Sequence, residues 1–177
     1  MKVMKFNGND YAWDILKRNA MDVRALLKVS HNQESVWLEL KADPFCRRDC
    51  PNGPTDEAIW HTLKAIVAMV NTRGGCIVFG LDDKTHKPDV KLYDNRKNLV
   101  TNNRDEFHRN ITEVFLEVTE RGKGLNIEGQ EYVLSKSIEP YCELRSGVFC
   151  DGKMLSVLLV KPSDGDDFVW VTKKNER

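Results

Sequence analysis

Apolar residues in the middle of the chain recur at spacings of three and four, which predicts one apolar stripe on a helix ending at Val70. Thr55 is placed to cap this helix, and Asp56 and Glu57 put negative charge in its first turn, where the helix dipole favours it. The stripe consists of Ile59, Trp60, Leu63, Ile66, Val67 and Val70. The pattern stops at residues 71–75, where a glycine allows the left-handed conformation that closes a helix.

An uninterrupted apolar run follows this turn and predicts a buried strand over Cys76–Leu81. Asp82 and Asp83 come directly after it, where a strand delivers side chains to the open end of a sheet. We therefore expect the helix, turn and strand between Ile59 and Asp83 to form the centre of the fold.

A second strand is predicted over Glu34–Lys41 because apolar and polar residues alternate there. The alternation puts Val36, Leu38 and Leu40 on the core face, and Trp37, Glu39 and Lys41 on the other face. Glu34 precedes the strand proper, so its side chain need not follow the alternation. The strand thus offers a carboxylate and an amine, two residues apart, on one exposed side.

Helices are predicted mainly before the central strand, and strands mainly near the end of the chain. The remaining helical patterns cover Asn9–Asn19, Met21–Val29 and Arg104–Thr119. Strand patterns cover Gln130–Leu134, Ile138–Leu144, Gly147–Cys150, Met154–Val160 and Phe168–Val171, with Asp151–Gly152 as a hairpin turn. This order predicts a single α+β domain with a mixed β-sheet packed by helices.

Length and composition suit one globular domain, because 177 residues can bury a proper core. Lys plus Arg and Asp plus Glu both number 27, which argues mildly against strong nucleic-acid binding by the whole chain, although a local basic face survives a neutral total. No apolar run approaches the roughly 20 residues of a membrane helix, and the N-terminus lacks the apolar core of a signal peptide. Five cysteines without an export signal favour reduced thiols, and we expect a cytoplasmic protein with no membrane partner.

Zinc is not expected, because the candidate ligands form an incomplete pattern. Cys46 and Cys50 are four residues apart in a predicted loop, and His61 lies downstream. Cys142 and Cys150 could in principle complete a set of four ligands, but two cysteines in a hairpin more often pack as buried core residues.

The residues Glu39, Lys41 and Asp82 suit the hydrolysis of a phosphodiester. That reaction needs negative charge neutralised in the transition state and a water molecule made nucleophilic. Carboxylates on neighbouring strands can hold Mg²⁺ or Mn²⁺, and an adjacent lysine can orient the water or stabilise the oxyanion. The alternative is a solvated strand face on which Glu39 and Lys41 contribute only to ion pairs.

Three segments together resemble the Schlafen family, and more broadly the AlbA-type Schlafen domain of prokaryotic proteins. They are Glu-Ser-x-x-x-Glu-Leu-Lys (34–41), Asn-Thr-Arg-Gly-Gly (71–75) and Gly-Leu-Asp-Asp (80–83). The resemblance covers residues 34–171 as a core and leaves residues 1–33 as an N-terminal helical extension. It implies nucleic-acid binding. For members that cleave transfer or ribosomal RNA, it also implies a metal-dependent endoribonuclease site with three carboxylates.

Carried across residue by residue, the resemblance assigns the three metal-binding carboxylates to Glu34, Glu39 and Asp82, and the catalytic amine to Lys41. Leu40 and Met69 stand where the family usually has phenylalanine, as core replacements of similar volume. Members that cleave RNA pair two related lobes around a cleft, so this chain would need a homodimer to form a comparable groove.

Two cations are candidates for contact with nucleic-acid phosphates. Arg73 lies beside the glycine pair, although an exposed arginine there also complements the helix dipole. Lys84 begins a polar segment, residues 84–103, with a local positive bias. Trp37 could stack on a base or pack under a neighbouring element. ATP binding is not expected, because the chain has no Gly-x-x-x-x-Gly-Lys-Ser/Thr loop.

Three functions are therefore open at the level of the sequence. The first is a nucleic-acid-binding Schlafen-like domain acting as a metal-dependent endoribonuclease on structured RNA. The second is a non-catalytic module, regulatory or otherwise, that binds DNA or RNA. The third is a protein-interaction or oligomerisation domain that keeps only the fold.

Overall fold

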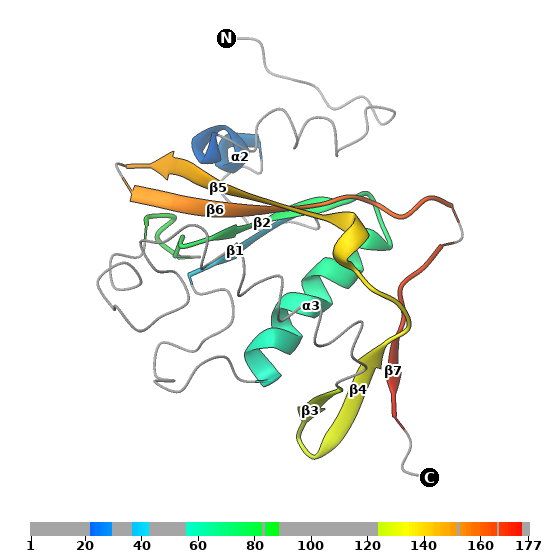
Figure 1. Cartoon of the computed structure of the whole chain (residues 1–177). Helices are drawn as coiled ribbons and strands as arrows, with labels where there is room; N and C mark the ends of the chain where they lie inside the picture. Colours follow the sequence, from blue (N-terminus) through cyan, green and yellow to red (C-terminus); the bar gives the residue numbers. More distant parts are fainter. Residues whose placement is uncertain are drawn as a thin grey trace.

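The computed structural model describes residues 22–29, 37–42, 56–82, 84–88, 124–151, 153–165 and 167–174 (Figure 1). The predicted helices Asn9–Asn19 and Arg104–Thr119 lie outside these residues. So do the cap Thr55, the carboxylate Glu34, and the loop cysteines Cys46 and Cys50.

A four-stranded mixed sheet forms the centre of the described molecule, with strand order β1-β2-β6-β5. β1 is Leu38–Lys41, β2 is Gly75–Phe79, β5 is Cys142–Cys150 and β6 is Lys153–Val160. β1 and β2 are parallel, whereas β6 is antiparallel to both β2 and β5. The predicted α+β domain with a mixed sheet packed by helices is confirmed.

Among the described residues, one helix packs on each face of this sheet (Figure 1). α3, Asp56–Val70, lies on the face to which β2 contributes Ile77 and Phe79. α2, Val23–Val29, lies on the opposite face, to which β2 contributes Cys76 and Val78. Because both faces are covered, every residue of β2 is buried, which explains the uninterrupted apolar run in the sequence.

A second, three-stranded antiparallel sheet lies on the far side of α3 from the mixed sheet (Figure 1). It has the order β3-β4-β7, with β3 at Leu125–Ile127, β4 at Gln130–Leu134 and β7 at Val171–Lys173. It packs on α3 partly through the rings of Trp60 and Tyr132, whose centroids are 5.0 Å apart. Sequence periodicity missed β3 because three residues are too few to show alternation.

The predicted strand Phe168–Val171 meets β7 only at Val171. Two further strand predictions need correction. Ile138–Leu144 and Gly147–Cys150 were expected as separate strands, but β5 is continuous and the register shifts between Ser146 and Val148. A bulge accommodates the extra residue without ending the strand. The residues before β5, Glu139–Tyr141, form a 3-10 turn, because Pro140 has no N–H to contribute to a ladder.

The turn between α3 and β2 is tightly constrained by steric contacts. The Gly74 N–H donates to the Met69 carbonyl at 2.9 Å, and the Thr72 hydroxyl donates to the Ala68 carbonyl at 2.8 Å. Gly74 has φ 75°, and a Cβ there would lie 2.6 Å from the Val160 carbonyl oxygen. A Cβ on Gly75 would lie 2.7 Å from the Trp37 carbonyl oxygen. Both glycines are therefore needed to bring α3 against the sheet.

Replacing Gly74 with alanine tests this close approach, and Gly129 provides a matched control. Gly129 has a similar φ of 79°, but a Cβ there would have no heavy atom within 4 Å. Gly129→Ala should lower the free energy of unfolding by about 1–2 kcal/mol, the cost of the left-handed conformation. Gly74→Ala should lower the free energy of unfolding by about 1–3 kcal/mol more than Gly129→Ala does, because the backbone around Val160 must shift. Urea denaturation measures both, and equal losses would contradict the steric account.

Candidate functional site

Glu39 and Lys41 lie on the α3 face of the mixed sheet. In the parallel register of β1 and β2, Glu39 is paired with Ile77 and Lys41 with Phe79, and both partners belong to the α3-side core. Leu40, by contrast, is buried on the α2 face, as the alternation predicted.

The expectation that this second face is exposed is wrong. The side chains of Glu39 and Lys41 are only 26% and 23% exposed, because their face of the sheet is the one that α3 covers. Trp37 was expected beside them, but it precedes β1 and packs against the α2-side core. It thus takes the packing role that was the alternative to base stacking.

A short ion pair joins the two polar side chains of β1. The Lys41 Nζ donates to the Glu39 Oε1 at 2.5 Å. Side chains two residues apart in a strand point to the same face, which allows this contact. Within the described part of the chain, Lys41 is the hydrogen-bond partner of this carboxylate. The pair therefore places an acceptor oxygen and an ammonium together in a half-buried position.

Asp82 closes a turn just beyond β2. The Gly80 N–H donates to the Lys41 carbonyl at 2.8 Å. The hydrogen bonding between the parallel strands β1 and β2 therefore continues one residue past the end of β2. The Asp82 Oδ1 then accepts three hydrogen bonds: from the Lys84 N–H at 3.1 Å, the Thr85 N–H at 2.8 Å and the Thr85 hydroxyl at 2.9 Å. One oxygen of the predicted catalytic carboxylate thus has a structural role. An aspartate followed by turn residues is the sequence signal for it.

The parallel strands bring Lys41 and Asp82 to the same end of the sheet, with Glu39 two residues farther back on β1. Among the residues that the structure describes, no group of three or more His, Cys, Asp or Glu side chains is placed to hold a metal ion. Glu34, the third predicted ligand, lies outside them. The described chain therefore supplies two of the three predicted carboxylates.

The two candidate phosphate contacts lie at opposite ends of β2. Arg73 is exposed in the turn before β2, and Lys84 is exposed in the turn after it. Five residues of strand separate these ends by on the order of 15 Å. Only Lys84 therefore neighbours Asp82, and Arg73 belongs to a different part of the surface.

Two described cysteines have protonated, buried thiols, and two stand far apart on β5. Cys142 and Cys150 stand at the two ends of β5, roughly 25 Å apart at the rise of a strand, so the two together cannot complete one zinc site. Burial raises the pKa of the Cys76 thiol to about 12 and that of Cys142 to about 12. A thiol that keeps its proton is a poor ligand and a poor nucleophile.

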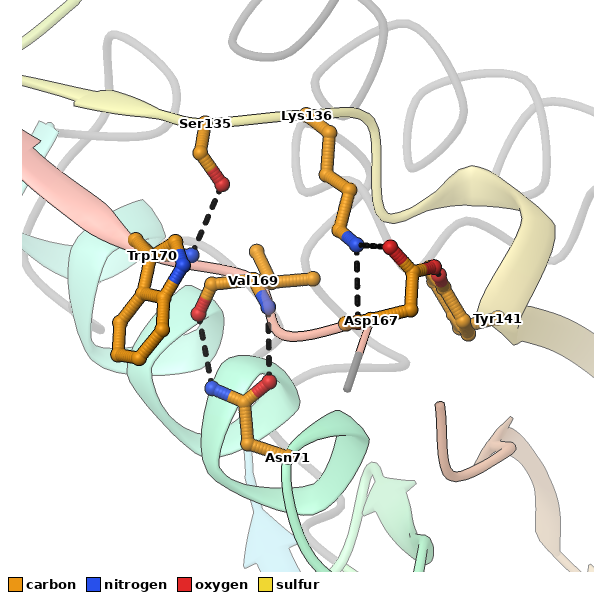
Figure 2. A network of polar contacts seen from close by, with 7 residues as sticks. All are labelled: Asn71, Ser135, Lys136, Tyr141, Asp167, Val169 and Trp170. Atoms are coloured by element: carbon orange, nitrogen blue, oxygen red, sulfur yellow. Dashed lines mark hydrogen bonds and ion pairs between the residues drawn. The ribbon is translucent and has the colours of Figure 1, made fainter. Parts of the chain in front are cut away.

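A polar cluster that the sequence did not reveal fixes the segment before β7 (Figure 2). The Lys136 Nζ donates to the Asp167 carbonyl at 2.8 Å and also to the Asp167 carboxylate. The Tyr141 hydroxyl donates to the other carboxylate oxygen at 2.5 Å. The hydrogen bond from Lys136, and then that from Tyr141, lower the pKa of Asp167, while bonding to Asp167 raises the pKa values of Lys136 and Tyr141.

These directions predict how the stability contribution of this cluster depends on pH. A lowered aspartate pKa contributes stability above the ordinary value of 3.8, and this is lost as pH falls through the folded pKa. The raised pKa values contribute stability below their ordinary values, 10.0 for tyrosine and 10.5 for lysine, and this is lost as pH rises through the folded pKa values. Asp167→Asn should therefore lower the melting temperature between pH 3.8 and 10.0, with the difference shrinking outside that window.

Asp164→Asn is the control for this pH series. Its carboxylate is 95% exposed and lies 3.9 Å from Lys161, so its removal should change the melting temperature little at any pH. Differential scanning calorimetry across the pH range makes the comparison. A melting temperature of Asp167→Asn equal to that of the wild type at neutral pH would refute the role of the cluster.

Comparison with known proteins places the chain in a family. No curated protein matches the chain. The family model for Schlafen, AlbA_2 matches residues 34–175, a range that holds β1, the α3–β2 turn and the segment ending at Asp82. It also contains every predicted site residue, from Glu34 to Lys84. This match suggests a nucleic-acid-binding domain. Because the model covers most of the chain, the chain belongs to the Schlafen AlbA_2 family.

Proposed function

We propose that this chain is a nucleic-acid-binding domain that cleaves structured RNA as a metal-dependent endoribonuclease. The observation that carries the proposal is the half-buried pair of Glu39 and Lys41 on a strand parallel to the one that leads to Asp82. A buried or half-buried ion pair is weak evidence for stability, because desolvation offsets much of the attraction between its charges. On a strand whose end lies next to the segment leading to Asp82, it suits chemistry on an anionic substrate.

The donor chemistry of this strand end fits Mg²⁺ or Mn²⁺, which take oxygen ligands. Glu39 and Asp82 would hold the ion together with Glu34. The Glu39 carboxylate keeps one oxygen beyond the one bonded to Lys41, and three hydrogen bonds from the following turn orient the Asp82 carboxylate. When bound, the ion supplies charge neutralisation at the phosphate and a water of lowered pKa.

Lys41 has two roles in this proposal. With no substrate bound, its ammonium neutralises the half-buried Glu39 carboxylate. With RNA bound, the same ammonium stabilises the negative charge that develops on the phosphate oxygens in the transition state. A cleft comparable to that of two-lobed relatives would be completed by a second copy of the chain, so we expect cleavage by a homodimer.

Charge-removing variants that keep the hydrogen bonds test this mechanism. Glu39→Gln keeps an acceptor for Lys41, and Asp82→Asn keeps an Oδ1 acceptor for the Lys84 and Thr85 N–H groups. Each should reduce Mn²⁺-dependent cleavage of a structured RNA by about 10²–10³-fold, the loss seen when one electrostatic contact is removed from a transition state. Gel analysis of end-labelled RNA gives the rates.

Asp82→Ala separates the structural role of this residue from the catalytic one. It should lower the melting temperature because the Lys84 and Thr85 donors lose their acceptor, whereas Asp82→Asn should not. Cleavage by a Glu39→Gln/Asp82→Asn double variant at the wild-type rate would rule out the catalytic proposal.

A non-catalytic nucleic-acid-binding module is the second candidate. The observation that favours it is that both described carboxylates already have partners within the fold, Glu39 with Lys41 and Asp82 with the turn at residues 84–85. In this case the exposed cations, among them Arg73 and Lys84, act only on phosphates. A protein-interaction domain, the third candidate, would bind no nucleic acid even at low salt.

Salt dependence tests whether these two cations contact phosphates. Binding should weaken linearly in log salt, and Arg73→Ala and Lys84→Ala should each reduce the magnitude of the slope by about 1, because each phosphate contact releases about one counterion. Lys28→Ala, on the exposed side of α2, is the matched control and should leave the slope unchanged. Fluorescence anisotropy with a labelled RNA measures the slopes. Equal slopes for all four proteins would exclude these two cations as phosphate contacts.

A further inference from the structure

Two large apolar side chains are exposed in the described part of the chain, and they lie next to each other. Phe168 is 38% exposed and Trp170 is 61% exposed. Their ring centroids are 5.6 Å apart and the rings are tilted by 45°. The residue between them, Val169, is 1% exposed and joins the core on α3. Side chains alternate in direction along this extended segment, so both aromatic rings point to solvent while Val169 points to the core.

The backbone that carries these rings is held from three directions (Figure 2). The Trp170 N–H donates to the Ser135 hydroxyl at 2.9 Å, and the Ser135 N–H donates to the Trp170 carbonyl at 2.9 Å. On the other side, the Asn71 side chain donates to the Val169 carbonyl at 2.8 Å and accepts from the Val169 N–H at 2.9 Å. Asp167, just before the rings, is bonded by Lys136 and Tyr141. The rings are thus exposed on an ordered support, which lowers the entropic cost of binding.

The apolar area is too small for a stable protein interface. A typical partner contributes about 800 Å² to an interface, whereas an aromatic side chain buries about 150–250 Å² when fully covered, and both rings here are already partly covered. β7 begins directly after Trp170, and alternation puts Thr172 and then Lys174, which follows the strand, on the same face as Trp170; Lys174 is paired with Glu131. The surroundings are polar, so the area fits a flat aromatic ligand of the size of a nucleobase.

An exposed cation follows the end of α3 that contacts the aromatic segment. The Asn71–Val169 hydrogen bonds hold the end of α3 against the chain between the rings, and Arg73 follows two residues later. Arg73 is exposed and forms no ion pair with another residue that the structure describes. Lys173 lies on the other face of the second sheet, because its register partner Tyr132 stacks on Trp60 of α3. A positive group near an aromatic face matches a base attached to its phosphate backbone.

We propose that Trp170, supported by Phe168, is a stacking platform for an unpaired base of single-stranded nucleic acid. The two rings are within contact distance of each other, so the base stacks on the open face of Trp170 and does not enter between them. Arg73 contacts an adjoining phosphate. The inference rests on the nucleic-acid binding proposed above and specifies single-stranded segments as the ligand at the opposite end of β2 from Glu39 and Asp82.

Binding in the absence of metal tests this platform independently of cleavage. The protein, in EDTA, is titrated into labelled oligouridine, oligothymidine and a duplex, each of about 12 nucleotides, a length within the site size of such surfaces. Trp170→Ala should weaken single-strand binding by about 5- to 150-fold, the loss typical of one stacked base, and Trp170→Phe should lie between it and the wild type. Duplex binding should not change. Comparing the oligouridine with the oligothymidine separates RNA from DNA.

Thr172→Ala, two residues farther along the same face, is the control and should bind single strands as the wild type does. A Trp170→Ala variant that keeps wild-type affinity for single strands would overturn the proposal. So would a Trp170→Ala variant that dissociates a dimer in sedimentation while its oligonucleotide affinity is unchanged, because the rings would then form a protein contact. Failure of Glu39→Gln to affect Mn²⁺-dependent cleavage would refute the endoribonuclease proposal alone and leave the platform intact.

Discussion

The close contact at the turn between α3 and β2 is the constraint on which the rest of the described structure depends. Gly74 and Gly75 let the end of the helix approach the Val160 and Trp37 carbonyls to distances that no side chain would allow. This approach fixes α3 on the mixed sheet and sets the start of β2. From the same turn, Asn71 bonds both backbone groups of Val169 and so anchors the chain that enters the second sheet.

The turn also determines which groups lie together at each end of β2. The strand is buried on both faces and parallel to β1, so its far end delivers Asp82 to the same edge as Lys41. Its near end places Arg73 close to the segment that carries Trp170. The proposed chemistry and the proposed base contact are therefore at two ends of one strand, and a single-stranded segment of several nucleotides would be needed to reach both.

Much of the fold could be predicted from the sequence where one periodicity extends over many residues. The stripe of α3, the buried run of β2 and the pattern of β4 gave the right elements because packing and local preference agree there. The second sheet could not be predicted, since β3 has only three residues and its pairing with β4 depends on contacts with α3. The half-burial of Glu39 was also missed, because alternation identifies two faces but not whether a helix covers the second one.

The residues of the candidate site were predicted from the sequence motifs, but the packing and capping contacts that these residues make could be seen only in the structure. The Asn-Thr-Arg-Gly-Gly segment, part of the family resemblance, acts here mainly through Asn71, Thr72 and the two glycines as a set of packing and capping contacts. Asp82 likewise caps the turn that follows it. A sequence match at these positions therefore combines the requirements of the fold with those of the proposed chemistry, and only charge-specific variants separate the two.

The most direct test of the central claim is to locate the site of Mn²⁺ binding by paramagnetic broadening of backbone amide resonances. If carboxylates from the two parallel strands share an ion, substoichiometric Mn²⁺ should broaden the amides of Glu39, Lys41 and Asp82 first, and Glu39→Gln should abolish this effect. Uniform weak broadening over the surface, or strongest broadening at a distant segment such as residues 128–131, would contradict the account.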